Sequence, residues 1–249
     1  MLAIVGAMQE EIALIVHSLE GARTLEFGRR QFHVGALHGA ETVVAFSRWG
    51  KVAAAATVTQ LLASFPITRL ILTGVAGSVQ RGLAIGDVVV ARGLMQHDLD
   101  ARPIFQRYEI PLLGAAILEA HGPTAAALAA AAAGFIATDL AAAVPASELE
   151  FFGVRSPQVK VGLIGSGDKF FASAAEVEEL AMRLPALLCV EMEGAAVAQV
   201  CHEYGIPFGV VRTISDVADE EAGHDFPRFL NRVARHYSAG ILARLVREG

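Results

Sequence analysis

The sequence predicts an α/β protein, a three-layer α/β/α sandwich with a central mixed, mostly parallel sheet. Short apolar runs typical of buried strands alternate along the chain with segments whose apolar residues recur at helical spacing. The 249 residues are 54% hydrophobic, which is enough to bury one large core. Because no Pro-, Gly- or Ser-rich linker divides the chain, we expect one domain over residues 1–249.

Apolar periodicity defines the elements of the first part of the chain. The segment over 9–20 has apolar residues three and four apart, which predicts a helix, and two β-like runs around Leu37-His38-Gly39-Ala40 predict a hairpin. The expected elements are, in order, a strand over 2–7, a helix over 9–20, hairpin strands over 31–35 and 42–46, a helix over 52–63 and strands over 70–73 and 87–91.

The second part of the chain continues the alternation. An alanine-rich segment over 124–137 predicts a helix packed outside the sheet, because it is too short and too weakly apolar to span a bilayer. The elements expected after it are a strand over 159–164, a helix over 174–184, a strand over 186–190, a helix over 194–204, a strand over 208–214 and a helix over 226–246.

Composition limits the classes of partner. The net charge of -6 and the pI near 5.8 argue against a nucleic-acid or anionic-membrane surface. Cys189 and Cys201 are too few for a disulfide scaffold and suit a reducing compartment. The run over 2–7 has no basic flank, so we expect no signal peptide. Together these features predict a soluble, cytoplasmic protein without nucleic-acid or membrane partners.

Polar or glycine residues follow several of the predicted strands. In open α/β sheets, ligands bind outside the carboxyl ends of the strands, so these residues predict one convergent pocket. Ordinary turn chemistry would explain the glycines but not the acids. The residues are Glu10 and Glu11, Gly74 to Ser78, Ser166 to Asp168, Glu191 and Glu193, and Ser215 and Asp216.

The segment Cys189-Val190-Glu191-Met192-Glu193-Gly194 is the clearest of these strand ends. It brings two carboxylates to the end of a buried strand, where each must be paired, hydrogen-bonded or used. We expect Glu191 to support the site, paired with a donor that the sequence does not identify.

Several familiar sites are missing from the sequence. No Gly-x-Gly-x-x-Gly, Walker loop or Gly-x-Ser-x-Gly elbow occurs. The spacing of His97-Asp98-Leu99-Asp100 matches no standard metal site, and a solvated loop is expected there. We therefore expect neither a metal nor a cofactor. The remaining candidates are carboxylates, which suit acid–base work on a glycosidic bond.

Four motifs in register resemble those of the bacterial methylthioadenosine/S-adenosylhomocysteine nucleosidases of the purine nucleoside phosphorylase superfamily. The resemblance runs from residue 4 to beyond 219 and is weakest between about 96 and 158. The motifs are Gly6-Ala7-Met8-Gln9-Glu10-Glu11, Gly165-Ser166-Gly167-Asp168-Lys169-Phe170, Val190-Glu191-Met192-Glu193-Gly194-Ala195 and Arg212-Thr213-Ile214-Ser215-Asp216-Val217-Ala218-Asp219.

The resemblance implies a catalytic pair. Glu11 matches the general base that activates water on the ribose face opposite the leaving adenine, and Asp216 matches the acid that protonates the purine ring. Without the resemblance, Glu11 would be interpreted as a solvated acid in the first turn of a helix, where the helix dipole favours negative charge. Asp216 must hold a proton at neutral pH to act as an acid, which burial could arrange.

The resemblance also implies the substrate contacts. Glu193 matches the carboxylate that binds the ribose hydroxyls, with Met192 against the sugar, while Phe170 matches the ring that stacks on adenine. The backbone of Phe171 should read the purine edge. The remaining expected substrate-binding residues are Gly77 and Arg212, near the ribose and the attacking water, and Ser215.

Hydrolysis is favoured over phosphorolysis. The related phosphorylases bind phosphate with arginines after the first strand and before the glycine turn, where this chain has the acidic segment 9–11 and the apolar Ile71-Leu72. A carboxylate that faces the nucleophile would repel phosphate and suits water.

Three departures from the family pattern bear on specificity. Val75 replaces a serine of the glycine turn, and the segment 102–113, which in the family helps to close a neighbouring subunit's site, differs from the common pattern. Trp49 replaces a smaller residue near the expected alkylthio pocket, so we predict a preference for methylthioadenosine over S-adenosylhomocysteine.

By resemblance, the protein is a homodimer that cleaves small nucleosides, 5′-deoxyadenosine among them, to adenine in methionine salvage. Two alternatives stay open at this point. One is another enzyme of the superfamily, such as a futalosine-type hydrolase or a nucleoside phosphorylase. The other is a catalytically silent nucleoside-binding protein on the same fold.

Overall fold

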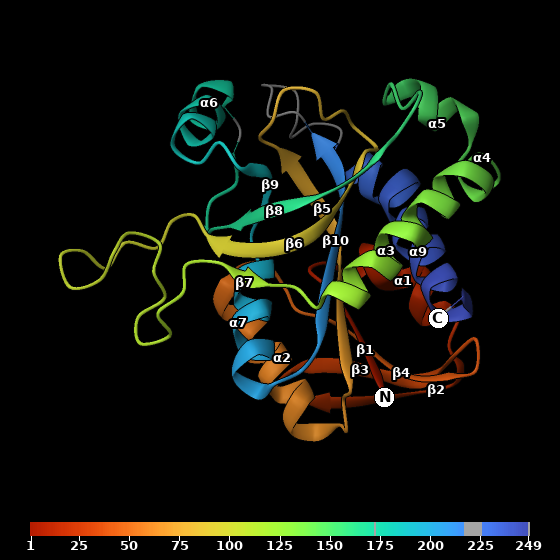
Figure 1. Ribbon diagram of the computed structural model, residues 1–249. Helices are drawn as coiled ribbons and strands as arrows, with labels where there is room; N and C mark the ends of the chain where they lie inside the picture. Colours follow the sequence, from red (N-terminus) through yellow and green to blue (C-terminus); the bar gives the residue numbers. More distant parts are fainter. Residues whose placement is uncertain (172, 217–225, 249) are drawn as a thin grey trace.

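The computed structural model describes residues 1–171, 173–216 and 226–248, and within them ten strands form one mixed sheet (Figure 1). The strands are β1 (Leu2–Gly6), β2 (Glu20–Phe27), β3 (Arg30–Leu37), β4 (Ala40–Phe46), β5 (Arg69–Ser78), β6 (Val88–Gln96), β7 (Leu118–Glu119), β8 (Val159–Ser166), β9 (Leu187–Glu191) and β10 (Phe208–Asp216).

Helical segments connect and cover these strands. Two of them, η1 and η2, are π-helical turns within longer helical runs. The segments are α1 (Gln9–His17), α2 (Lys51–Ser64), α3 (Gly122–Gly134), η1 (Phe135–Asp139), α4 (Leu140–Ala143), α5 (Ala146–Phe151), α6 (Ala174–Arg183), α7 (Gly194–Tyr204), α8 (Phe226–Phe229), η2 (Leu230–Ala234) and α9 (Arg235–Glu248).

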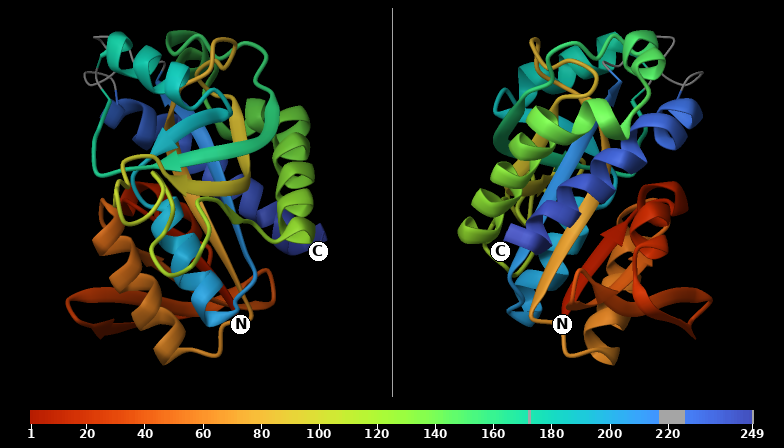
Figure 2. Two further views of the ribbon diagram at one scale, coloured as in Figure 1. Left: turned by 60° about the vertical axis from the view of Figure 1, so that its left-hand side comes forward. Right: turned by 90° about the vertical axis from the view of Figure 1, so that its right-hand side faces the viewer.

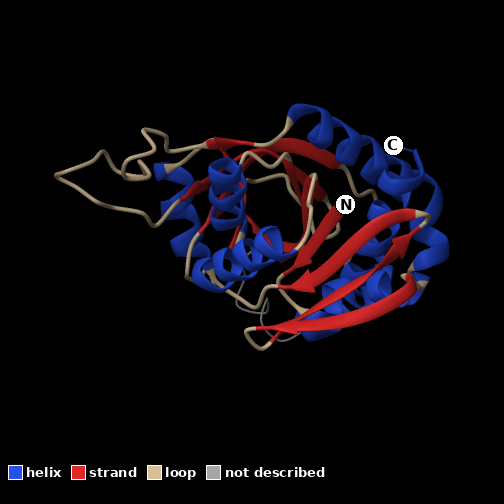
Figure 3. Cartoon of the chain, turned by 90° about the horizontal axis from the view of Figure 1, so that it is seen from below, coloured by secondary structure: helices blue, strands red, loops and turns tan. Residues whose placement is uncertain are grey.

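The sheet curves back on itself. Strand β10 pairs in parallel with β5 on one side and antiparallel with β6 on the other, and the order β6-β8-β9-β5 completes a ring. The length of β5 makes this possible, because its first part lies between β1 and β10 while Gly77 and Ser78 pair with β9. Figure 3 shows the curved strands with helices outside them. The carboxyl ends of β5, β8, β9 and β10 therefore meet.

Helices cover both faces of the sheet (Figure 2), which confirms the predicted α/β class. On one face α2 packs against α7, and Val58 and Val197 are fully buried there. On the other face α9 packs against α1 and α3, and Ile15 and Leu242 lie in that second core. Parallel pairing joins β1 to β4 and β5, and β8 to β6 and β9.

The structure corrects three sequence expectations in the sheet and its connections. Strand β5 does not end at Thr73 but continues to Ser78, because Gly74 and its successors keep pairing with β10. Strand β2 was missed since its residues are almost all exposed and show no apolar alternation. The short segments β7 and α5 were also missed.

The alanine-rich helix is longer than predicted. Within the described ranges it continues through η1 and α4 as a 22-residue run, Gly122–Ala143. An 18-residue window of this run has a mean hydropathy of 1.7. The expectation that this segment is too short and too weakly apolar to cross a membrane was therefore wrong. Core helices meet the same two criteria, and this run packs beside α9 with Leu128 and Phe135 buried.

Candidate active site

A cavity with about 690 Å³ of empty space, open solvent at its mouth included, lies where the strand ends meet. The nine residues expected to act on or bind the substrate all line it: Glu11, Gly77, Phe170, Phe171, Met192, Glu193, Arg212, Ser215 and Asp216. The strand end Ser166 to Asp168, expected in the same pocket, does not line it. Glu10, the neighbour of Glu11, lines an adjacent groove instead. Residues Val217, Ala218 and Asp219 of the last motif lie outside the described residues.

Glu11 reaches the cavity from the first turn of α1, directly after β1. Its carboxylate is only 1% exposed and accepts three backbone hydrogen bonds. Oε2 accepts from the amides of Ala7 (2.7 Å) and Met8 (3.0 Å), and Oε1 accepts from the amide of Val75 (3.0 Å). Burial raises the pKa of Glu11, while the charge of Arg212 and these amides act against the rise. The carboxylate is thus fixed in place and able to take up a proton.

Gly74 separates Glu11 from Arg212. Its φ is +153°, and a Cβ atom there would lie 2.3 Å from Arg212 Nη1 and 2.5 Å from Glu11 Oε1. Both distances are shorter than van der Waals contact, so a side chain would displace one group or the other. Glycine at this position lets the carboxylate and the guanidinium share one wall of the cavity.

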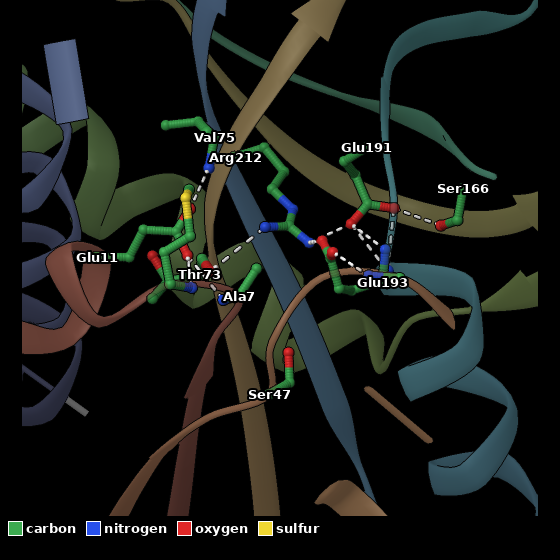
Figure 4. Close-up of polar contacts among 12 residues, drawn as sticks. Ala7, Glu11, Ser47, Thr73, Val75, Ser166, Glu191, Glu193 and Arg212 are labelled. Carbon is green, nitrogen blue, oxygen red and sulfur yellow. Dashed lines mark hydrogen bonds and ion pairs between the residues drawn. The ribbon is translucent and has the colours of Figure 1, made fainter. Parts of the chain in front are cut away.

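Arg212 lies at the centre of the polar contacts (Figure 4). Its guanidinium, 1% exposed, forms an ion pair through Nη2 with Glu191 Oε2, and Nη1 donates to the Thr73 carbonyl at 3.4 Å. Glu191 also accepts from the Ser166 hydroxyl. Arg212 is therefore the donor that the sequence could not identify for Glu191.

Glu193 begins α7 beside this pair. Its Oε1 accepts the backbone N–H of Gly50 at 2.9 Å, and its Oε2 lies 3.5 Å from Arg212 Nη2. Burial and the neighbouring charge of Glu191 raise the pKa of Glu193 to about 7, against the opposing charge of Arg212. Its protonation can therefore change near neutral pH.

Asp216 ends β10, lines the cavity and is 5% exposed. Its Oδ2 accepts a hydrogen bond from the Ser215 hydroxyl at 2.8 Å. A Cβ atom on Gly77 would approach Asp216 Oδ1 to 3.0 Å, so glycine avoids crowding of this carboxylate. The Ser215 hydroxyl thus orients the Asp216 side chain, and Gly77 leaves room beside it.

Apolar and aromatic side chains form the rest of the lining. Phe170 is 46% exposed and meets Phe226 edge to face, with ring centroids 6.2 Å apart. Trp49, 60% exposed, lies at the mouth, where the cavity adjoins a second groove. Val75 lines the wall, and its backbone rather than its side chain binds Glu11. A flat apolar ligand with a polar edge fits such a lining.

The contacts of Lys51 with Asp98 and Asp168, outside the cavity lining, were not predicted from the sequence. Lys51 donates through Nζ to Asp98 Oδ1 at 2.6 Å, and its backbone N–H donates to Asp168 Oδ1 at 2.9 Å. The amide of Asp168 donates in turn to Asp98 Oδ2 at 2.9 Å. The solvated loop expected over 97–100 is confirmed for Asp98 and Asp100, which are exposed, but His97 is 3% exposed and packs against Phe171. The acids of the Gly165-Ser166-Gly167-Asp168 and His97-Asp98 segments were the available signals.

Metal binding was also considered. In the part of the chain that the structure describes, no three His, Cys, Asp or Glu side chains are grouped so as to hold a metal ion. The described lining offers carboxylates, one buried guanidinium and aromatic rings. These groups can move protons, bind hydroxyls and stack on a planar base.

Comparison with known proteins gives a consistent result. The family model of the phosphorylase superfamily matches residues 1–247. The chain is 36% identical to a 5′-methylthioadenosine/S-adenosylhomocysteine nucleosidase of Chromohalobacter salexigens, covering 100% of this chain and 97% of the relative. It is also 36% identical to an aminodeoxyfutalosine nucleosidase of Helicobacter pylori, covering 99% and 98% of the two chains.

A solved structure agrees with these relatives. The fold is similar, with a TM-score of 0.86 and 34% identity, to a 5′-methylthioadenosine/S-adenosylhomocysteine nucleosidase of Neisseria meningitidis in complex with methylthio-immucillin-A. The match covers 100% of this chain and 99% of that one.

Proposed function

This chain belongs to the 5′-methylthioadenosine/S-adenosylhomocysteine nucleosidases of the phosphorylase superfamily, which are N-glycosyl hydrolases, and we propose that it hydrolyses 5′-methylthioadenosine to adenine and the thio-ribose. S-adenosylhomocysteine and 5′-deoxyadenosine are further proposed substrates. The observation that carries the proposal is the convergence of Glu11, Glu193 and Asp216, from three different elements, on one cavity lined by aromatic rings.

We assign the general acid to Asp216. Its protonated carboxyl group gives a proton to the purine ring while the bond between the ribose carbon and the purine nitrogen breaks and its electron pair passes to the base. The departing adenine is then neutral, and positive charge develops on the sugar. The Ser215 hydroxyl, 2.8 Å from Asp216 Oδ2, orients the acid for this transfer.

We assign the general base to Glu11. Its carboxylate takes a proton from water as the water oxygen bonds to the ribose carbon, and the product is the free thio-ribose. After release, Glu11 loses that proton to solvent and Asp216 regains one, so each turnover is balanced. One such acid or base contributes about 10²–10⁴-fold in rate. The raised pKa of Glu11 suits a group that must accept a proton.

The remaining lining residues are proposed to bind the nucleoside. Glu193 accepts the ribose hydroxyls, Met192 packs on the sugar, and the half-exposed Phe170 ring stacks on adenine. The backbone of Phe171 reads the purine edge. Gly77 leaves room for the ligand beside Asp216.

The charges of the cavity favour water over phosphate as the nucleophile. Among the described lining residues the cations are Arg212, which is paired with Glu191, and Lys169, which is 2.6 Å from Glu176. Arg212 is therefore not free to bind a phosphate dianion, Lys169 is partly neutralised by a surface ion pair, and Glu11 and Glu193 would repel the dianion.

We also propose that residues 1–249 act as one domain within a homodimer, in the cytoplasm and in methionine salvage. The segment between β6 and β7 projects from the body, yellow-green in Figure 1, and carries the exposed Ile104 (82%) and Leu112 (91%). At the start of α2, Val52 is 81% exposed. Apolar side chains exposed to this degree support burial against a second copy.

A second candidate substrate follows from the Helicobacter pylori relative. Because this chain is as similar to that aminodeoxyfutalosine nucleosidase as to the first relative, aminodeoxyfutalosine is a competing substrate of the same chemistry.

The test is a panel of nucleosides assayed without phosphate: methylthioadenosine, S-adenosylhomocysteine, 5′-deoxyadenosine, aminodeoxyfutalosine and inosine. We expect the highest catalytic efficiency with methylthioadenosine and none with inosine. An efficiency highest with aminodeoxyfutalosine would replace the proposed substrate. Adenine binding without any turnover would overturn the enzymatic proposal.

A further inference from the structure

Four charged side chains form one buried cluster at the cavity: Glu11, Glu191, Glu193 and Arg212. Each is at most 8% exposed. Three carboxylates and one guanidinium therefore lie close together with little exposed surface. Buried charges are stable only when they are paired and hydrogen-bonded, so the way in which Arg212 is shared decides which carboxylate stays charged toward the ligand.

The guanidinium is shared unequally. Its Nη2 forms the close ion pair with Glu191 Oε2 and lies 3.5 Å from Glu193 Oε2. Within the described chain, Arg212 has no ion pair with Glu11, which is held by backbone amides instead. Figure 4 shows the guanidinium with Glu191 and Glu193 on one side and Glu11 on the other. The positive charge is thus largely matched by Glu191.

Glu191 has little capacity left for a substrate. Its Oε1 accepts from the Ser166 hydroxyl and from the amide of Gly194 at 3.0 Å. Its Oε2 accepts from Arg212 and from the amides of Glu193 (3.2 Å) and Gly194 (2.8 Å). A carboxylate with this many donors serves the protein rather than the ligand.

We propose, on the basis of the nucleosidase function, that Glu191 is a positioning residue that takes up most of the charge of Arg212, so that Glu11 and Glu193 keep negative charge available to stabilise the positive charge that develops on the ribose. The sugar carries that charge only in the transition state, so the effect accelerates cleavage rather than tightening binding of the neutral substrate.

Removal of the Glu191 charge should therefore also change the protonation of Glu193. The groups that face Glu193 are Glu191 from β9, Arg212 from β10, Glu11 from α1 and the Gly50 N–H at the start of α2. Without the Glu191 charge, Glu193 loses one repulsive neighbour, and the Arg212 guanidinium is left to pair with Glu193. Both changes lower the pKa of Glu193.

The test compares two ligands in the Glu191→Gln variant, which keeps the side-chain shape and removes the charge. One ligand is a neutral, uncleavable methylthioadenosine analogue, and the other is an analogue whose sugar ring carries a protonated nitrogen. We expect the affinity for the cationic analogue to fall about 10- to 100-fold, and the affinity for the neutral one to change by less than about threefold. The kcat should fall with little change in KM, and the acid limb of its pH profile should move to lower pH.

Two further variants complete the test. Ser166→Ala removes a neutral donor from Glu191 but keeps its charge, so the preference for the cationic analogue should stay. The double variant Glu191→Gln/Arg212→Gln removes both charges of the pair and should also keep that preference, even where the single Glu191→Gln variant does not fold. Glu191→Asp retains the charge and serves as the conservative rescue.

Equal losses for both analogues in Glu191→Gln, or loss of the preference in a folded double variant, would overturn the proposal. The ratio of the affinities for the two analogues can be measured without any turnover of substrate. If Glu191→Gln loses the preference for the cationic analogue while the wild-type protein cleaves no adenine nucleoside, the proposed function fails and the electrostatic role of Glu191 stands.

Discussion

Gly50 donates its backbone N–H to Glu193 Oε1 at 2.9 Å, across 143 positions of the chain. The first turn of α2 thereby holds the carboxylate that we assign to the ribose hydroxyls. The same turn is anchored by Lys51, whose backbone N–H donates to Asp168 and whose ammonium group lies 2.6 Å from Asp98. The binding of the sugar should therefore depend on contacts that lie behind the cavity.

We predict that Lys51→Met weakens substrate binding. Loss of the ammonium group releases Asp98 and Asp168, so Gly50 holds Glu193 less firmly. We expect KM for methylthioadenosine to rise about tenfold, the equivalent of one hydrogen bond to a charged group, with kcat changed by less than about threefold. Steady-state kinetics measure both. Arg81→Met is the control, because its ion pair with Glu178 is on the surface, and a KM unchanged in Lys51→Met would refute the coupling.

Gly74→Ala should abolish most activity. The added Cβ would meet Arg212 Nη1 and Glu11 Oε1 at 2.3 and 2.5 Å, so the base must move. A displacement near 1 Å at a reacting group lowers the rate about 100-fold. Gly82→Ala is the matched control, since Gly82 also has positive φ (+99°) but nothing within 4 Å of an added Cβ. Similar kcat values in the two variants would contradict the role of Gly74.

Glu193 should make stability depend on pH. Its pKa is about 7 in the folded protein, raised by burial from the ordinary 4.5, so the folded state keeps a proton that the unfolded chain releases. This contribution to stability is fully present below pH 4.5 and is lost as pH rises through 7. We expect Glu193→Gln to gain up to about 3 kcal/mol in unfolding free energy, relative to wild type, between pH 4.5 and pH 8. Urea denaturation at both pH values measures it, and a pH-independent difference would contradict it.

Trp49 should lower the catalytic efficiency for substrates with long 5′ substituents. The indole lines the cavity and is 60% exposed, so we expect it to narrow the space for a homocysteine tail. We expect Trp49→Ala to raise the efficiency for S-adenosylhomocysteine relative to methylthioadenosine about tenfold. Tyr204→Ala, another exposed aromatic that does not line the described cavity, is the control. Equal efficiencies of the wild-type protein on both substrates would argue against the effect.

The sequence predicted elements whose signals are local. Helix α7 begins and ends where expected, at Gly194 and Tyr204, because a buried strand precedes it and Gly205 ends it in the left-handed conformation at φ +67°. Strand β2 gave no signal since its side chains are exposed. Closure of the ring depends on the pairing of β10 with β5 and β6. Because β10 lies far from both of these strands in the sequence, no local pattern indicates the closure.

The sequence predicted residues that the structure brings to the cavity, but not the contacts that connect residues on separate elements. Glu11, Glu193 and Asp216 stand out as acids at strand ends, and the structure brings them to one cavity. The pairing of Glu191 with Arg212 joins two strands, and only the register of the sheet sets that contact. The contact between Asp98 and Lys51 could not be predicted, because the two residues lie 47 positions apart and Asp98 belongs to a loop.

The most direct test is adenine release from methylthioadenosine, measured with and without added phosphate, in the wild-type protein and in Glu11→Gln and Asp216→Asn. We predict release in phosphate-free buffer that phosphate does not accelerate, and a fall of at least about 100-fold in each variant. Release that requires phosphate and yields a sugar phosphate, or near-wild-type turnover in either variant, would contradict hydrolysis by this pair of carboxylates.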